Sequence, residues 1–301
     1  MTAEPAYVWR QIEGLLQHAS HSVTLIAPFI KKPIFEAAVA AVPASVEHIH
    51  CVTRWTPAEV AAGVSDPEIM ELTESDERVH ISLCPALHAK IYIADDRCLV
   101  GSANLTGLAT GRVPHANLEL LLEAATGHPE VQRVLKQIEA VATTASPHLA
   151  ELVRRQAELL QADASTPSTE SDVLPTPLWY PVTRRPENLY ALYCGRGTFA
   201  SAVEAGILHD LALLNISVGL GEAEFNGAVR TRLLKMPELQ KLQVGESISN
   251  VELERAIAEH AGVSDALARR RSEIIAAWLR HFDRYYTEVG MWELRRGREI
   301  T

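Results

Sequence analysis

The first half of the chain carries short apolar runs that alternate with stretches of helical periodicity. Apolar runs of four to eight residues with a period of two are typical of strands, and a period near 3.6 is typical of helices. The pattern predicts strands over residues 22–28, 46–54, 79–83, 87–94 and 118–122, and helices over residues 7–18, 33–42 and 57–72, with a long helix from residue 128. Such alternation predicts an α/β fold, a mixed sheet covered by helices.

One predicted strand has a polar face. A side-chain period of two places His88, Lys90 and Tyr92 together and turns the intervening alanine and isoleucines into the core. A second short apolar run, residues 98–100, leads into the Gly-Ser-Ala-Asn sequence of residues 101–104. Glycine and small residues let a backbone approach a bound group closely, so the two polar sets can converge on one oxyanion.

The spacing of these residues matches a known signature. His88-x-Lys90 is followed by Asp95, and then come Ser102 and Asn104 within the Gly-Ser-x-Asn sequence. This pattern resembles the signature of the phospholipase D superfamily, and the resemblance covers roughly residues 5–145. It implies a phospholipase D-like mixed sheet sandwiched by helices. In that family the residue matching Asp95 is generally structural, so a supporting role is expected for it here.

A second segment completes the resemblance. Residues 117–122 read as a strand on which Asn117 and Glu119 share a face, and they resemble the family's Asn-x-Glu segment. The resemblance implies that Lys90 and Asn104 bind the non-bridging phosphate oxygens. It also implies that Glu119 orients the ring of the catalytic histidine and that Ser102 supports this network.

The implied chemistry needs two histidines. A neutral imidazole, here that of His88, attacks phosphorus and forms a phosphohistidine, while a second, protonated imidazole gives a proton to the leaving oxygen. None of the chain's twelve histidines begins a second copy of the motif. Single-copy members of the superfamily pair two chains about a twofold axis, so a homodimer with a shared active site is expected. The mechanism requires neither a metal nor another cofactor.

Composition is that of a soluble globular protein with 301 residues, 47% hydrophobic and 22% charged, which leaves room for two domains. No run of eighteen apolar residues and no signal-peptide pattern occurs, so neither a membrane partner nor export is expected. The four cysteines form no Cys-x-x-Cys pair, which argues against a zinc site and against a disulfide framework. A reducing cytoplasm is therefore the expected compartment. The net charge of −10 disfavours indiscriminate nucleic-acid binding, although local patches decide such binding.

The chain changes character after its first half. Residues 162–178 are rich in Ser, Thr, Pro and acidic residues, and such a segment is typical of a linker. We therefore expect a catalytic domain over residues 1–161 and a smaller, mainly helical domain over residues 179–301. Residues 195–200 match the dinucleotide-binding Gly-x-Gly-x-x-Ala pattern in form, with an ordinary turn as the alternative.

The end of the chain has the pattern of a helix-turn-helix. Helices are predicted over residues 250–260 and 265–280, separated by a tight turn. Arg269 and Arg270 lie near the start of the second helix, where a recognition helix contacts bases and phosphates. Arg271 departs from the pattern, because such motifs usually place an apolar packing residue there. A helical partner-binding or dimerisation module is the alternative, and the three arginines could also form a solvated helix face.

Two further polar features lie on predicted strands. Arg54 ends a strand on the motif's side of the sheet, where an arginine could hold a flanking phosphate or remain a solvated strand-end charge. His48, His50 and His80 are predicted to be partly buried sheet histidines rather than metal ligands.

Three functions follow from these observations. The first is a metal-independent phosphodiesterase that acts as an endonuclease on DNA, in the manner of restriction or phage-defence nucleases. The second is a phospholipid phosphodiesterase or transphosphatidylase, and the third is a non-catalytic phosphate-binding protein. Relatives of the second kind usually carry two motif copies and a membrane anchor or signal, which this sequence lacks. The complete set of motif residues argues against the third.

Overall fold

The computed structural model describes residues 6–163, 179–283, 286–288 and 293–296, and it divides into two compact units. The first comprises Met1–Asp172 and Ser217–Leu220, and the second comprises Val173–Ile216 and Gly221–Thr301. Most of the expected linker, residues 164–178, lies outside the described residues. The boundary between the units falls within that segment. Within the described parts of the chain, no helix is long and apolar enough to cross a membrane.

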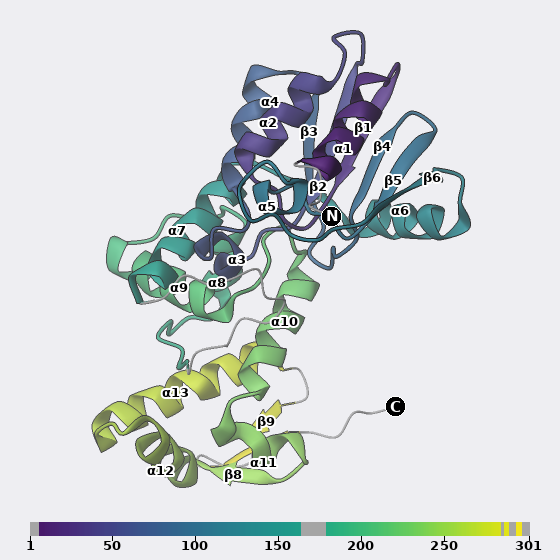
Figure 1. Cartoon of the computed structure of the whole chain (residues 1–301). Coiled ribbons are helices and arrows are strands. Elements are labelled where there is room, and N and C mark those ends of the chain that lie inside the picture. The colour runs from purple at the N-terminus through teal and green to yellow at the C-terminus, as the bar shows by residue number, and fades with distance from the viewer. Residues whose placement is uncertain (1–5, 164–178, 284–285, 289–292, 297–301) are drawn as a thin grey trace. The chain divides into compact units, whose positions relative to one another are not determined.

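The first unit is a mixed sheet covered by helices (Figure 1). Its helices are α1 (Tyr7–Gln17), α2 (Lys32–Ala41), α3 (Pro57–Ala61), α4 (Glu71–Ser75), α5 (Gly107–Thr110), α6 (Pro129–Val141) and α7 (Pro147–Asp163), with a 3-10 turn, η1 (Pro67–Met70). Its strands are β1 (Ser22–Ile26), β2 (His48–Thr53), β3 (Val79–Leu83), β4 (Ile91–Ala94), β5 (Arg97–Gly101), β6 (Leu121–Ala125) and β7 (Thr143–Thr144).

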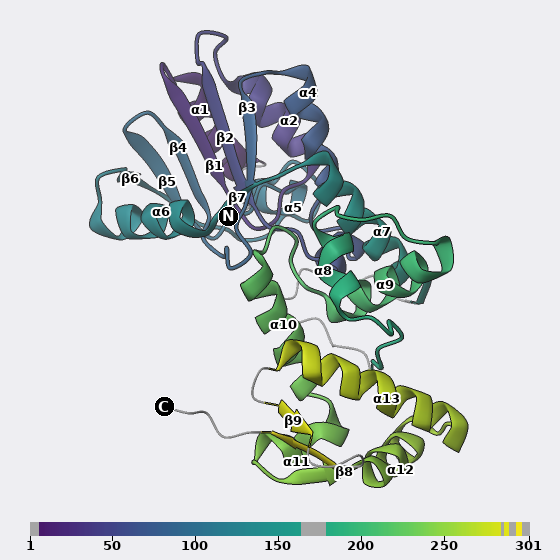
Figure 2. The same cartoon turned by 180° about the vertical axis from the view of Figure 1, so that it is seen from behind.

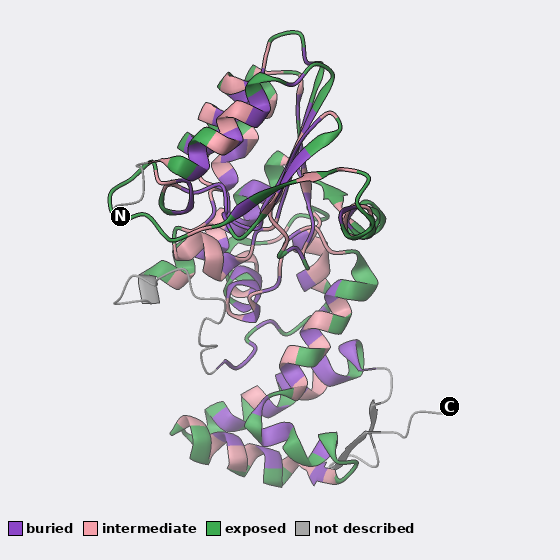
Figure 3. Ribbon diagram, turned by 45° about the vertical axis from the view of Figure 1, so that its right-hand side comes forward, coloured by how far each residue is buried: buried purple, intermediate pink, exposed green. Residues whose placement is uncertain are grey.

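The seven strands lie in the order β6-β5-β4-β1-β2-β3-β7. Strands β1, β2 and β3 are parallel, and the remaining neighbours are antiparallel. Helix α1 packs against α2, β4 and β5, whereas side chains of α6 join a buried cluster with the isoleucines of β4. Buried residues line the strands at the centre of the sheet (Figure 3). The mixed α/β class predicted from the sequence is confirmed.

Several element boundaries differ from the predicted ones. The helix expected over residues 57–72 is divided into α3, η1 and α4, because Gly63 adopts a φ of 71° and Pro67 lacks a donor N–H. Strand β4 begins only at Ile91, so His88 and Lys90 precede it. Strand β6 likewise begins at Leu121, after the segment that carries the Asn-x-Glu sequence.

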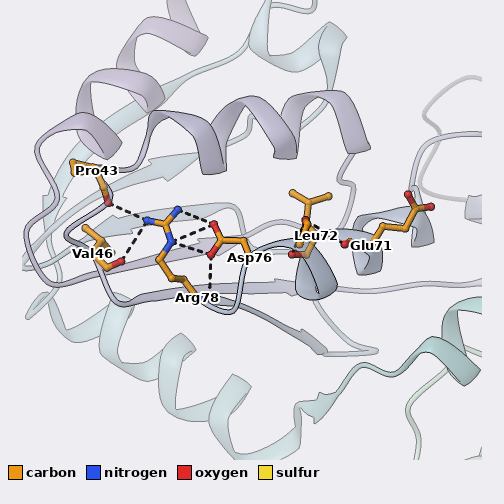
Figure 4. Close-up of polar contacts among 7 residues, drawn as sticks. Pro43, Val46, Glu71, Leu72, Asp76 and Arg78 are labelled. Carbon is orange, nitrogen blue, oxygen red and sulfur yellow. Dashed lines mark hydrogen bonds and ion pairs between the residues drawn. The ribbon is translucent and has the colours of Figure 1, made fainter.

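An ion pair fixes the loop that leads into β2 and the turn before β3 (Figure 4). The Arg78 guanidinium pairs with Asp76 at 2.7 Å and donates to the carbonyl oxygens of Pro43 at 3.0 Å and Val46 at 3.4 Å. The hydrogen bonds from Arg78 hold the pKa of the Asp76 carboxyl below its usual value. These contacts lie at the opposite end of the parallel strands from the motif and define the register of β2 and β3.

A short segment from the second half of the sequence belongs to the first unit. Val218 N donates to Trp55 O at 3.1 Å, and Thr143 Oγ1 donates to Gly219 O at 2.9 Å. Gly219 has a φ of 95°, and a Cβ atom there would lie 2.7 Å from Thr143 Oγ1. The expected two-domain division did not include this return of the chain.

The second unit is mainly helical, as predicted, and also contains a small sheet (Figure 2). Its helices are α8 (Glu187–Tyr193), α9 (Ser201–Leu214), α10 (Glu222–Leu234), η2 (Pro237–Leu239), α11 (Gln240–Gln243), α12 (Asn250–Ala261) and α13 (Asp265–Phe282), and its strands are β8 (Ser247–Ser249), β9 (Tyr286–Glu288) and β10 (Glu293–Arg296). The Gly-x-Gly-x-x-Ala pattern follows helix α8 rather than a strand. It therefore forms a turn between two helices.

A buried carboxylate organises the core of this unit. Asp210 on α9 accepts hydrogen bonds from Trp179 Nε1 at 3.2 Å and from Thr183 N at 2.7 Å. Trp278 on α13 donates to Thr183 O at 2.7 Å, and its ring packs edge-on against Trp179 at 5.3 Å. These contacts fasten both α9 and α13 to the first described residues of the unit.

Candidate active site

His88 and Lys90 lie in the short segment that leads into β4. His88 is exposed and Lys90 is half-buried, with Lys90 Nζ donating to His88 O at 2.9 Å. Gly101 N donates to Lys90 O at 3.2 Å, which continues the pairing of β4 with β5 one step beyond the assigned strands. Lys90 is thereby fixed opposite the glycine that begins the Gly-Ser-x-Asn sequence.

Arg54 holds the residue that precedes His88. Its Nη1 donates to Leu87 O at 2.7 Å, its Nε donates to Glu59 Oε1 at 3.0 Å, and its guanidinium lies 5.3 Å from the centre of the Phe29 ring. Only 16% of the side chain is exposed. Arg54 is therefore not a solvated strand-end charge, and its guanidinium already has protein partners.

Ser102, Asn117 and Glu119 form one hydrogen-bonded cluster. Ser102 Oγ donates to Glu119 Oε2, and Asn117 Nδ2 donates to Glu119 Oε1 at 3.3 Å. The hydroxyl of Ser102 also accepts from Leu120 N at 3.1 Å. The structure thus brings together residues from the two segments that the sequence pattern singled out.

Gly101 makes this cluster possible. A Cβ atom at this position would lie 1.8 Å from Leu120 O, far inside van der Waals contact. The sequence interpretation assigned the glycine to the approach of a bound group. The structure instead shows that it admits the neighbouring backbone, which brings Glu119 next to Ser102.

Tyr92 is fully buried rather than part of an open polar face. Its hydroxyl donates to Ala103 O at 2.7 Å, so it supports the loop between Ser102 and Asn104. Burial raises the pKa of the Tyr92 phenol, and the negative charge of Glu119 raises it further.

Asn104 is the buried polar residue of the site. It is 8% exposed, and its Oδ1 has no hydrogen-bond partner within the part of the chain that the structure describes. Hydrogen bonds from Leu105 N to Phe29 O at 3.2 Å and from Lys31 N to Leu105 O at 3.0 Å hold the adjacent backbone. Buried polar atoms without a partner are uncommon, and because Oδ1 is an acceptor, only a hydrogen-bond donor could complete its bonding, whereas the Nδ2 group of the same amide is the donor that could reach a phosphate oxygen.

Asp95 lies at the other end of β4, away from this cluster. It adopts a φ of 54°, and its carboxylate accepts hydrogen bonds from the backbone N–H groups of Ser20 at 2.8 Å, His21 at 2.9 Å and Ser22 at 3.0 Å. These bonds hold the pKa of the carboxyl below its usual value. They tie the β4–β5 turn to the start of β1.

The described residues contain no group of three or more His, Cys, Asp and Glu side chains that could hold a metal ion. The rings of His48 and His80 lie 6.4 Å apart on adjacent strands. His50 shares a hydrogen bond of 2.9 Å with Ser82 Oγ, and burial lowers its pKa, with a further contribution from His80. These three histidines are sheet residues.

The predicted arginines of the second unit lie on α13. Arg269 and Arg270 are exposed, and Arg269 Nε lies 3.8 Å from Glu273 Oε1. Arg271 is only partly exposed, with its guanidinium 4.4 Å from the centre of the Tyr180 ring. Arg271 thus packs against Tyr180 at a position where helix-turn-helix motifs usually have an apolar residue. This packing explains why the sequence departs from the motif there.

No family model and no curated protein matches the chain. Among solved structures, NucT from Helicobacter pylori aligns with a TM-score of 0.32 and 16% identity, over 44% of this chain and 86% of that one. TrmBL2, an archaeal chromatin protein with a novel mode of DNA binding, aligns with a TM-score of 0.29 and 14% identity, over 46% and 53%. Phosphatidylserine synthase of Haemophilus influenzae Rd KW20 aligns with a TM-score of 0.32 and 12% identity, over 56% and 44%. These similarities are too weak to support an assignment, so the interpretation of the site depends only on the contacts described above.

Proposed function

We propose that the protein is a metal-independent phosphodiesterase, specifically an endonuclease that acts through a phosphohistidine. The observation that carries the proposal is the Ser102–Glu119–Asn117 cluster, assembled beside the segment that bears His88 and Lys90. These residue types supply a nucleophile, a cation and an oriented carboxylate, which is what displacement at phosphorus needs.

In the proposed reaction, His88 attacks phosphorus as a neutral imidazole, so that a P–N bond forms and the P–O bond to the leaving strand breaks. Protonated His88 of the partner subunit gives its proton to the leaving oxygen. Water then attacks the phosphohistidine, and the same partner imidazole takes a proton from it. Lys90 and the buried amide of Asn104 stabilise the charge on the non-bridging oxygens.

Arg54 acts in this proposal as a positioning residue rather than a phosphate ligand. Its guanidinium is held by Glu59 and donates to the carbonyl of Leu87, directly before His88. Fixing that carbonyl restricts the backbone from which the nucleophile projects.

An apolar surface on the edge strand supports the homodimer. Leu118, Leu120 and Leu122 are 98%, 58% and 57% exposed, and they alternate along the segment that contains Glu119 and enters β6. Strand β6 stands at one end of the sheet order, so its outer edge is open. Exposed apolar residues on an open edge favour association, and a second copy of the chain would cover them beside the site.

The test is cleavage in EDTA of supercoiled plasmid, single-stranded DNA and RNA by the wild-type and His88→Ala proteins. We expect the wild type to cut DNA and the variant to lose at least about a thousand-fold in rate while keeping its fold and oligomeric state. Full activity of His88→Ala would overturn the phosphohistidine mechanism. Loss of all cleavage in EDTA would overturn the metal-independent assignment.

The pathway is a finer part of the proposal. An intracellular nuclease with a separate DNA-recognition unit suits restriction or defence against phage, and its place of action is then the cytoplasm. Release of phosphatidic acid from phospholipid vesicles, without any cleavage of nucleic acid, would instead identify a lipid phosphodiesterase.

A further inference from the structure

The end of the second unit has more than the helix-turn-helix expected from the sequence. After α10 the chain forms β8, the pair α12 and α13, and then the strands β9 and β10 (Figure 1). The three strands are antiparallel in the order β8-β10-β9, so the strand that precedes the helix pair joins the hairpin that follows it. This connection defines a winged helix-turn-helix, in which a hairpin flanks the second helix of the pair.

The turn between α12 and α13 has a backbone conformation that ends one helix and begins the next. Gly262 ends α12 with a φ of 60°, and Ser264 stands in extended conformation directly before α13. Helix α13 packs against both α10 and α12. It is therefore held as a rigid element on two sides, as a helix that reads a groove must be.

One face of α13 is buried and the opposite face is open. Trp278, Ile275 and Ala268 are buried within the unit. The open side of the first turns presents Arg269 and Arg270, which are exposed. Arg269 Nε lies 3.8 Å from Glu273 Oε1, in an exposed ion pair of the kind that contributes little and exchanges readily.

We propose that α13 enters the major groove of double-stranded DNA, with Arg269 and Arg270 contacting base edges or phosphates. This inference deepens the proposed function, because it names duplex DNA as the substrate. The major groove of B-form DNA admits an α-helix, whereas the deep, narrow major groove of duplex RNA does not. A fixed helix with an exposed arginine pair is therefore suited to DNA.

The charge distribution favours DNA binding by α13 alone over non-specific DNA binding by the whole surface. The chain carries a net charge of −10, whereas the α13 sequence contains four arginines and two acidic residues. Arg271 does not add to the exposed charge, because its guanidinium stacks on Tyr180. Recognition is then concentrated on the open face of one helix.

The experiment uses the full chain in EDTA, with His88→Ala present in every protein so that the proposed nuclease does not cut the probes, and it measures binding by fluorescence anisotropy. The probes are a 30-base-pair DNA duplex, one of its strands, and an RNA duplex of the same sequence, each at two salt concentrations. The variants are Arg269→Ala/Arg270→Ala and, as a control with the same loss of charge, Arg133→Ala/Arg255→Ala, whose arginines are exposed on α6 and α12.

We expect the His88→Ala protein with an unaltered α13 to prefer the DNA duplex to both other probes. The α13 variant should lose at least about thirty-fold in affinity for that duplex and show a weaker salt dependence. The control should change by less than about threefold. Equal binding of duplex RNA, or equal losses in the two variants with unchanged circular dichroism, would overturn the inference.

A binding measurement on His88→Ala separates this inference from the proposed function. Duplex binding by His88→Ala that depends on Arg269 and Arg270 supports the inference, even if the wild type proves to cleave no DNA. If the wild type cleaves plasmid but the α13 variant binds duplex DNA normally, the nuclease proposal is supported and the proposal that α13 recognises DNA is overturned.

Discussion

At the scale of single residues, the contacts of Asp95 support a structural role for it, which remains a prediction. Its carboxylate accepts three backbone N–H groups at the start of β1. Because these bonds lower its pKa in the folded state, their stabilisation is fully present above the unfolded pKa of about 4 and is lost as the pH falls through the folded value.

Asp95→Asn should therefore lower the free energy of unfolding by about 1–2 kcal/mol at pH 7, after allowance for solvent screening. The difference from wild type should shrink as the pH falls below about 4. Urea unfolding at pH 7 and pH 3 measures both effects. Asp96→Asn, on an exposed neighbour, is the control and should change little. A deficit that stays constant with pH would contradict the role of the charge.

Gly101 gives a second prediction at this scale. Gly101→Ala places a methyl group 1.8 Å from Leu120 O, so the backbone on which Glu119 lies must move. We expect a loss of stability of about 1–3 kcal/mol and loss of most phosphodiesterase activity. Gly127→Ala is a matched control, since a Cβ atom there meets nothing within 4 Å. Near-normal activity in Gly101→Ala would show that the Ser102–Glu119 contact is dispensable.

Sequence spacing singled out the candidate residues of the proposed site but not the contacts that hold them. His88, Lys90 and Glu119 belong to local patterns, and a local pattern can be read from neighbours along the chain. The burial of Tyr92 and the hydrogen bond from Arg54 to Leu87 depend on strands that are distant in sequence. No periodicity encodes such contacts, so the packing role of Arg54 could not be predicted.

At the scale of elements, the edge strand β6 and the residues before it carry both a residue of the proposed site and the exposed leucines of the proposed dimer surface. Glu119 is tied to Ser102, whereas Leu118 and Leu120 are exposed. One stretch thus holds a carboxylate against Ser102 and leaves the two flanking leucines exposed, where the proposed second subunit would cover them.

Leu118→Glu/Leu120→Glu should therefore convert the expected dimer into a monomer and abolish cleavage. Burying the two new carboxylates in the apolar interface would cost more free energy than dimerisation provides. Sedimentation velocity and plasmid cleavage, measured on the same samples, test this. Val141→Glu, which alters an exposed apolar residue at the end of α6, should keep both properties. A fully active monomer would contradict the shared site.

Elements with strong local signals were predicted well, and those that depend on long-range pairing were not. The helix pair α12 and α13 matches its expected position because the Gly262 turn and the apolar periodicity are local. The sheet β8-β10-β9 and the return of Ser217–Leu220 to the first unit join residues that are far apart in sequence. A single sequence contains no pattern that shows which distant segments pair with each other.

At the scale of the whole molecule, the proposal of a site shared by two subunits makes a quantitative prediction about subunit mixing. If each reaction needs His88 from both subunits, a heterodimer of wild-type and His88→Ala chains is inactive. Random exchange at equal amounts leaves about one quarter of the dimers fully wild type, whereas independent sites would retain about one half of the activity.

Activity should therefore fall as the square of the wild-type fraction when the two proteins are mixed, unfolded in urea and refolded together. Wild-type protein diluted with Val141→Glu, a variant expected to be active, controls for losses on refolding. A linear decline would show that each subunit supplies its own proton donor, and the search for that group would then turn to the other histidines of the first unit. A quadratic decline requires two copies of His88 at one phosphorus, because no single chain can then complete both proton transfer and attack.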